Sequence, residues 1–202
     1  GDIKEFFLPR DFGEFCVGCT KCFMESEKKC SHYEKLKPLT DAMDEADVII
    51  LASPVYVYHV TGAMKTFLDH YGYRWMVHRP QESMFRKQGV CISTAAGAGM
   101  KPTNKDMADS LFFWGVAKRY QYGVRVAAVN WNGVSEKKKC AIDKATSGIA
   151  KKIVNNSKHV KPGIKTRAMF WAMHFAQRKG FNPCDAEYWK SKGWTGKKRP
   201  WK

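Results

Sequence analysis

Residues 48–69 read VIILASPVYVYHVTGAMKTFLD and combine three local patterns. The run Val48–Ala52 is apolar and rich in β-branched residues, which is typical of a parallel strand buried on both faces. Residues 53–62 follow as a loop that contains proline and glycine. From Ala63 to Tyr71 the apolar residues recur at helical spacing and form one face. The stretch therefore predicts a strand, a loop and an amphipathic helix, which is the repeating unit of an α/β fold.

The same alternation continues on both sides of this unit. Further strands are predicted at Ile3–Leu8, Gly89–Ser93 and Val124–Val129. Further helices are predicted from Pro38 onward, from an Asn104 cap to about Tyr120, and from a Ser135 cap to about Ser157. The last of these has a predicted inward face of Ala141, Ala145, Gly148, Ile149 and Ile153. The regular order of strand and helix predicts a doubly wound parallel sheet with helices on both faces.

The last part of the chain has a different character. Pro162-Gly163 interrupts the pattern, and Ile164–Lys179 is predicted to be a helix that is apolar nearly all round. Trp189, Trp194 and Trp201 follow it. Because large aromatic side chains are seldom left in solvent, we expect this segment to dock on the domain or on another subunit. We therefore divide the chain into a domain of residues 1–158 and an extension of residues 159–202.

The formal net charge of +16 is carried mainly by lysines and arginines after residue 135. Such residues usually form a solvated helix face and a charged tail, although they also attract an anionic partner or cofactor. A nucleic-acid-binding module is a further alternative. The sequence contains no nucleic-acid motif, and its basic residues are not interleaved with stacking aromatics, so this alternative is disfavoured.

Cysteine usage and hydropathy indicate the compartment. Four of the seven cysteines fall within residues 16–30, which is not the pattern of a secreted disulfide framework. The longest apolar runs are far too short to cross a bilayer, and the first residues do not resemble a signal peptide. These features predict a cytoplasmic protein without a membrane partner.

Two predicted loops occupy the position where doubly wound sheets bind ligands, beyond the carboxyl ends of the strands. Ser53–Thr61 follows one strand and contains Tyr56, Tyr58 and His59, whose rings can pack on an aromatic ligand. Thr94–Gly99 follows the next strand and is rich in glycine and alanine, so its backbone amides can approach a flat or anionic ligand. The alternative is that both are ordinary connections between strand and helix.

The cysteines Cys16, Cys19, Cys22 and Cys30 form the motif C-x2-C-x2-C-x7-C. Cysteines at two-residue intervals in a loop, closed by a fourth, suit a [4Fe–4S] cluster better than zinc, whose sites pair two separated knuckles. Zinc and unligated thiols remain as alternatives. The six histidines are not spaced as a metal site and are interpreted as surface or core residues.

The residues Ser53-Pro54-Val55-Tyr56, followed by Gly62, Lys65, Phe67 and Asp69, resemble the signature of the NADPH-dependent FMN reductase family. The cysteine motif is similar to that of the iron-sulfur flavoprotein branch of that family. The resemblance implies a flavodoxin-like fold, bound FMN, NAD(P)H as reductant and hydride or electron transfer through the flavin. It also implies a homo-oligomer, either a dimer or a tetramer. An electron carrier with the same cofactors, serving another redox protein, is the alternative function.

The resemblance implies a cofactor site built from both loops. The residues expected to border the flavin are Ser53, Pro54, Val55, Tyr56 and Val57 in the first loop, and Thr94, Ala95, Ala96, Gly97 and Gly99 in the second. No side chain is assigned as a general acid or base. The sequence departs from the family at its start, because the first strand and its phosphate-binding loop are not found. We therefore expect a first strand–helix unit to precede Gly1, and Ile3–Leu8 to be the second strand.

Overall fold

The computed structural model describes residues 1–202 and contains one parallel sheet. Its strands are β1 (Val48–Pro54), β2 (Gln88–Ala95) and β3 (Lys118–Arg125), in the order β1-β2-β3. Ile50 of β1 lies opposite Val90 of β2, which lies opposite Tyr120 of β3. The predicted parallel α/β sheet is confirmed. Three consecutive strands side by side match strands 3, 4 and 5 of the flavodoxin-like order 2-1-3-4-5.

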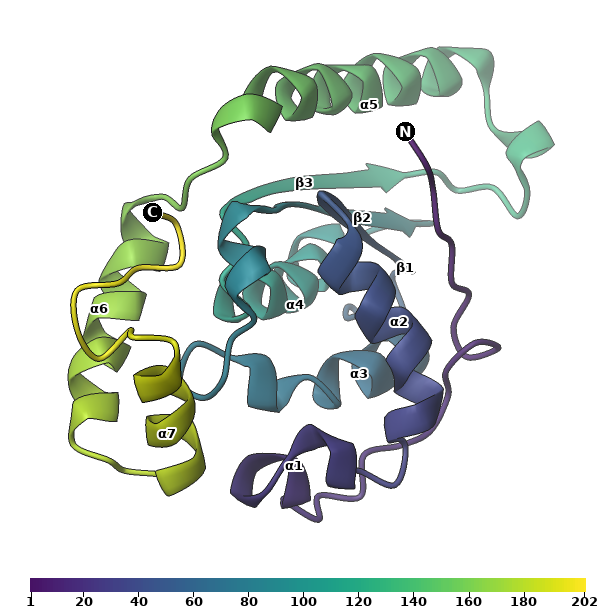
Figure 1. Ribbon diagram of the computed structural model, residues 1–202. Helices are drawn as coiled ribbons and strands as arrows, with labels where there is room; N and C mark the ends of the chain where they lie inside the picture. Colours follow the sequence, from purple (N-terminus) through teal and green to yellow (C-terminus); the bar gives the residue numbers. More distant parts are fainter.

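Helices lie on both sides of this sheet (Figure 1). On one side runs α5 (Glu136–Asn156), which contacts β3. On the other side α4 (Met100–Phe113) packs on β2 and β3, and α3 (Gly62–Asp69) confirms the predicted helix after the first loop. The remaining helices are α1 (Lys21–Met24), α2 (Tyr33–Glu45), α6 (Ile164–Arg178) and α7 (Pro183–Ser191). None of the helices is long and apolar enough to cross a membrane.

The predicted strand Ile3–Leu8 is wrong. These residues form no ladder, and the chain turns instead at residues 8–11. Asp11 stabilises the turn, because its carboxylate accepts from the Phe7 amide (2.5 Å) and its own amide donates to the Phe7 carbonyl (2.9 Å). Local bonds of this kind compete with strand pairing, which requires a partner strand.

The boundaries of three other predicted elements also shift. The helix expected to start at Pro38 begins earlier, at Tyr33, so Pro38 lies inside α2. The helix expected from Asn104 to Tyr120 is α4, which begins at Met100 and ends at Phe113. Gly115 follows with φ = 92°, a conformation that ends helices, and β3 begins at Lys118 rather than at Val124.

The expectation that both faces of β1 are buried is wrong as well. Ile49, Leu51 and Ser53 face the core, whereas Ile50 is 60% exposed on the other face. The helix on that side, α5, has no buried residue. Its expected inward face is half-buried at Ala145, Gly148, Ile149 and Ile153 and exposed at Ala141. The apolar pattern predicted the strand correctly, but the cover over a strand depends on how distant elements pack.

The C-terminal segment docks as expected. Phe170 of α6, Trp189 of α7 and Trp194 are buried together with Met76 and Phe85. These five side chains form a second apolar cluster beside the main core of the sheet and its helices. The docked aromatic residues bring α7 next to α1 and the cysteine motif. The division of the chain at residue 158 stays a prediction.

Candidate functional site

The two predicted loops leave neighbouring strands and meet at the carboxyl edge of the sheet. Pro54 at the end of β1 is paired with Thr94 near the end of β2. Just beyond, the Val55 amide donates to the Thr94 carbonyl (2.8 Å). The parallel register therefore places both loops on one edge, as the sequence predicted from their positions after buried strands.

The first loop contains a tight turn of unusual composition. Tyr56 and His59 are joined by two backbone hydrogen bonds of 3.0 Å, and Val57 and Tyr58 between them have φ angles of 48° and 68°. Two successive residues with positive φ form the type I′ geometry, which ordinarily uses Asn and Gly. A β-branched residue is strained there, and strain of this kind concentrates at functional sites.

The second loop packs directly on this turn. Gly99 has φ = 97°, and a Cβ atom on it would lie 2.6 Å from Val55 Cγ1 and 3.1 Å from Tyr58 Cα. Only glycine allows so close an approach. The Thr103 hydroxyl donates to the Gly99 carbonyl (2.9 Å) and so holds the end of the loop on the first turn of α4.

Asp106 of α4 binds two residues of the first loop. Its carboxylate contacts His59 Nδ1 (2.9 Å) and accepts from the Val60 amide (3.3 Å). Nothing in the sequence pattern distinguished Asp106 from other polar residues of its helix. Its position about two helical turns beyond the second loop becomes meaningful only once the loops are seen side by side.

The edge formed by both loops offers an exposed apolar surface. Tyr56, Val57 and Tyr58 are 62%, 93% and 63% exposed. A planar aromatic ring system can cover such side chains and remove them from water, so these residues fit a flavin ring. Ser53 differs from the other expected contacts, since it is buried and its Oγ accepts from the Thr61 amide (3.1 Å). Thr94, Ala96 and Gly97 are exposed in the second loop.

All four cysteines of the motif line one cavity of ≈ 70 Å³. None forms a disulfide, Cys16 and Cys19 are exposed, and Cys22 and Cys30 are partly buried. Burial, reinforced by the charges of Cys30, Cys16 and Cys19, raises the pKa of the Cys22 thiol to about 11. Thiolates crowded in this way repel one another unless a cation compensates them. The donor set therefore fits an iron–sulfur cluster, which is held by four thiolates.

The cysteine loop is held in place by residues far along the chain. The guanidinium of Arg79 donates to the carbonyls of Cys22 and Phe23, the latter at 3.1 Å. Asp185 of α7 is 1% exposed and accepts from Arg79 Nη1 (2.7 Å). Its second oxygen lies 2.7 Å from His78 Nδ1. The extension thus orients the arginine that binds the backbone of the motif.

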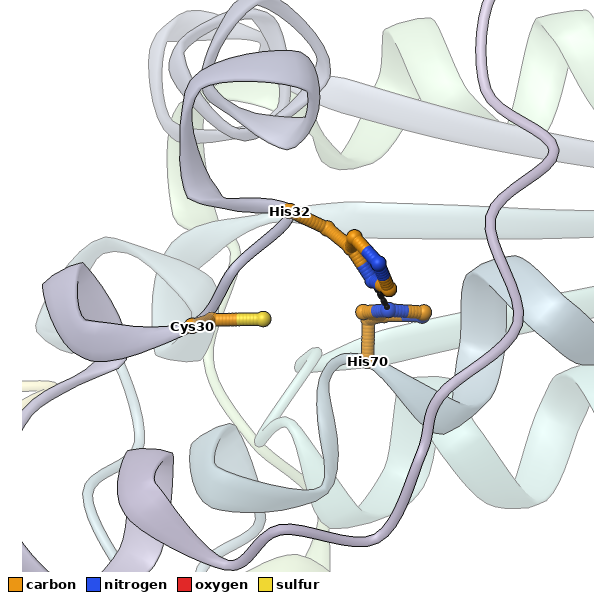
Figure 2. A group of neighbouring side chains, drawn as sticks. All are labelled: Cys30, His32 and His70. Carbon is orange, nitrogen blue, oxygen red and sulfur yellow. Dashed lines mark hydrogen bonds between the residues drawn. The ribbon is translucent and has the colours of Figure 1, made fainter.

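Two histidines lie against the same cavity. His32 Nδ1 and His70 Nε2 are 2.9 Å apart, and His70 Nδ1 lies 2.8 Å from the Thr66 carbonyl. Burial lowers the pKa of His70. Figure 2 shows the Cys30 side chain pointing toward this pair. The spacing of the histidines gave no reason to group them, and only the packing of α2 against α3 brings them together with Cys30.

Comparison with known proteins shows which sequences this chain resembles. The family model described as NADPH-dependent FMN reductase matches residues 2–127, a range that includes both loops and all four motif cysteines. An iron-sulfur flavoprotein of Archaeoglobus fulgidus is 39% identical over 88 residues, which are 42% of this chain and 36% of that protein. Iron-sulfur flavoprotein MJ0731 of Methanocaldococcus jannaschii is 31% identical over 68 residues, 34% of each chain. The chain thus spans about a third of the length of these relatives.

Two solved structures resemble the chain at low identity. An NADH:FMN oxidoreductase (EMOB) in its apo form has a TM-score of 0.45 and 21% identity, and the match covers 73% of this chain and 70% of that one. A flavone reductase has a TM-score of 0.49 and 16% identity, and the match covers 74% of this chain and 51% of that one.

Proposed function

This chain belongs to the NADPH-dependent FMN reductase family, and from that membership we propose that it is an NAD(P)H-dependent FMN oxidoreductase. The observation that carries the proposal is the contact of the two loops at Gly99, beside the exposed side chains of Tyr56, Val57 and Tyr58. In this proposal residues 53–57 border one edge of the flavin ring and residues 94–99 border the other.

Each loop has a distinct task in this proposal. Tyr56 and Tyr58 present their rings to the flavin, and the small residues Ala96 and Gly97 let the backbone approach it closely. Asp106, through His59 and Val60, keeps the turn in one position while a nicotinamide enters. The chemistry that bound FMN supplies is acceptance of a hydride and onward transfer of one or two electrons.

We also propose that Cys16, Cys19, Cys22 and Cys30 hold a [4Fe–4S] cluster. Two features support this: the cavity that all four side chains line, and the names of the relatives. In this arrangement Arg79 fixes the backbone at Cys22 and Phe23, so the thiol of Cys22 keeps one position.

The flavin proposal is tested by titrating the full chain with FMN and then adding NADPH or NADH without air. Binding and bleaching of the flavin absorbance are expected. Gly99→Ala should weaken FMN binding by about five- to thirtyfold, since it forces strain of about 1–2 kcal/mol onto the loop and 1.4 kcal/mol corresponds to tenfold. Gly148→Ala is the matched control, because this glycine lies in α5, outside both loops, and a Cβ there meets nothing within 4 Å. Absence of flavin reduction would contradict the activity, and equal binding by both variants would contradict the location.

A second candidate function is an electron carrier that serves another redox protein. The observation that favours it is the exposure of Cys16 and Cys19, with exposed Lys21, Lys28 and Lys29 in the same segment. Positive side chains beside a redox centre steer an acidic partner, and such association slows as salt increases. Reduction of the chain by NADPH at a rate independent of salt would favour the enzyme.

We further propose a cytoplasmic homo-oligomer. All seven cysteines are free, which supports a reducing compartment. Trp171 and Phe175 are 42% and 56% exposed on α6, and large exposed apolar side chains of this kind support self-association. Light scattering on the full chain distinguishes a monomer from a dimer or tetramer.

A further inference from the structure

We propose that Cys30, His32 and His70 form a mononuclear site for zinc or a similar divalent metal when the cavity holds no iron–sulfur cluster. One ligand atom from each residue lies within 4.8 Å of the others. In Figure 2 the Cys30 sulfur and both imidazoles converge from three directions. A thiolate with two imidazoles is a donor set that zinc prefers.

The distances suit a tetrahedral ion after a small adjustment. Zinc binds imidazole nitrogen at about 2.0–2.1 Å, so two such nitrogens lie about 3.3 Å apart around the ion. His32 Nδ1 and His70 Nε2 are 2.9 Å apart. The rings need to separate by a few tenths of an ångström, and the sulfur, which lies within 4.8 Å of both imidazoles, needs to approach by up to about an ångström. A three-residue set leaves a fourth position for water.

The hydrogen bonds of His70 prepare its Nε2 for a metal. A carbonyl only accepts, so the contact with the Thr66 carbonyl (2.8 Å) places the ring hydrogen on Nδ1. Nε2 of the neutral ring then carries a lone pair that points to His32. Metal-binding histidines commonly donate their other N–H to a backbone carbonyl in this way. Binding requires His32 to carry its hydrogen on Nε2 and the Cys30 thiol to release its proton.

The surroundings also hold both imidazoles in place. His70 is 6% exposed, so its nitrogen is largely shielded from competing water. The side chain is held at the C-terminal end of α3, and His32 stands at the start of α2. A metal would join these two helices beside the cysteine loop.

Cys30 belongs to both donor sets, which makes the two occupants competitors. A Cys30 thiolate committed to the histidines leaves only three thiolates for a [4Fe–4S] cluster. The competition between the iron–sulfur cluster and the mononuclear metal rests on the proposed cluster. The mononuclear site itself does not depend on that proposal. Binding of a mononuclear metal needs neither flavin nor iron–sulfur.

The test uses the full chain, purified in air and freed of iron by chelation under reducing conditions. Co²⁺ is added as a spectroscopic substitute for zinc, and the thiolate-to-metal and d–d absorption bands are followed. We expect one Co²⁺ per chain with tetrahedral bands. His70→Gln and His32→Asn should each weaken binding at least about tenfold, because even outer-shell partners of ligands contribute that much. Cys19→Ser should bind as the wild type does, since it changes only the cluster set.

The contrary results are equally specific. The proposal is overturned if the wild type binds no Co²⁺, or if both histidine variants bind as well as the wild type. Loss of binding in Cys19→Ser with full binding in the histidine variants would place the metal on the cysteine motif instead. Circular dichroism and thermal unfolding of each variant separate loss of a ligand from loss of the fold. A wild type that binds Co²⁺ but can be loaded with neither FMN nor a cluster would contradict the proposed function and leave this site intact.

Discussion

Replacing Asp185 by Asn is the sharpest test of how the extension supports the cysteine loop. The carboxylate is buried and bonded to Arg79 Nη1 at 2.7 Å and to His78 Nδ1 at 2.7 Å. The amide keeps the shape but removes the charge that compensates Arg79, which is itself 9% exposed. Breaking a buried ion pair by removing one partner costs about 3–5 kcal/mol. We expect the lower value, about 3 kcal/mol, because the amide oxygen still accepts a hydrogen bond.

The cost is measured by thermal unfolding. For a chain of this size about 1 kcal/mol lowers Tm by about 2–4 °C, so Asp185→Asn should lower it by roughly 10 °C. The matched control is Asp109→Asn, which breaks the ion pair of Asp109 with Lys105. The side chain of Lys105 is 71% exposed and that of Asp109 is 50% exposed. An exposed pair contributes less than about 1 kcal/mol, so this variant should stay within about 3 °C of the wild type.

A second readout concerns the loop itself. Arg79 donates to the Cys22 and Phe23 carbonyls, so a loosened arginine should make the segment around these residues more susceptible to limited proteolysis. If Asp185→Asn unfolds at the same temperature as Asp109→Asn and is cut no faster, the extension does not support the cysteine loop through this pair.

Three further variants follow from the backbone and the core. Val57→Gly should stabilise the chain by about 1 kcal/mol in denaturant unfolding, because valine at φ = 48° is strained; a lower midpoint would contradict this. Gly115→Ala should destabilise it by at least about 2 kcal/mol, since a Cβ would lie 2.7 Å from the Phe85 ring at φ = 92°, and an unchanged midpoint would argue against that contact. Burial raises the pKa of the Cys91 thiol from 9.0 to about 12, so the folded state holds a proton that the unfolded state has lost. Stability should therefore fall as pH rises from about 9 to 12, and Cys91→Ala should show a shallower fall; parallel curves would refute this assignment.

Much of the fold was predictable because it depends on short-range pattern. The run Val48–Ala52, the apolar face of α3 and the strand at Gly89–Ser93 are each determined by residues within a few positions of one another. The sequence-based prediction was wrong where the structure of a segment depends on a distant pairing partner. Residues 3–8 alternate like a strand, but a strand also needs a neighbour to pair with, and local bonds of Asp11 prevailed.

The candidate site also has some features that were predictable from local pattern and others that depend on distant contacts. The motif of four cysteines and the two loops at the sheet edge were evident from spacing and from position after the strands. Asp106 was not, since its role depends on contact with His59, 47 positions earlier. The exposed face of β1 at Ile50 was missed because the hydrophobicity of a residue indicates that it favours burial, but it does not show which element covers it.

By itself, the sequence determined that this chain forms a parallel α/β sheet, places two loops at its carboxyl edge and gathers four cysteines in one loop. Only the tertiary structure decided which residues serve that loop. His32 and His70 are 38 positions apart, and Arg79 and Asp185 are 106 apart. Local pattern determines helices and strands because their bonds are between near neighbours. Contacts at such separations arise only when the packing of whole elements brings buried polar groups to partners that replace water.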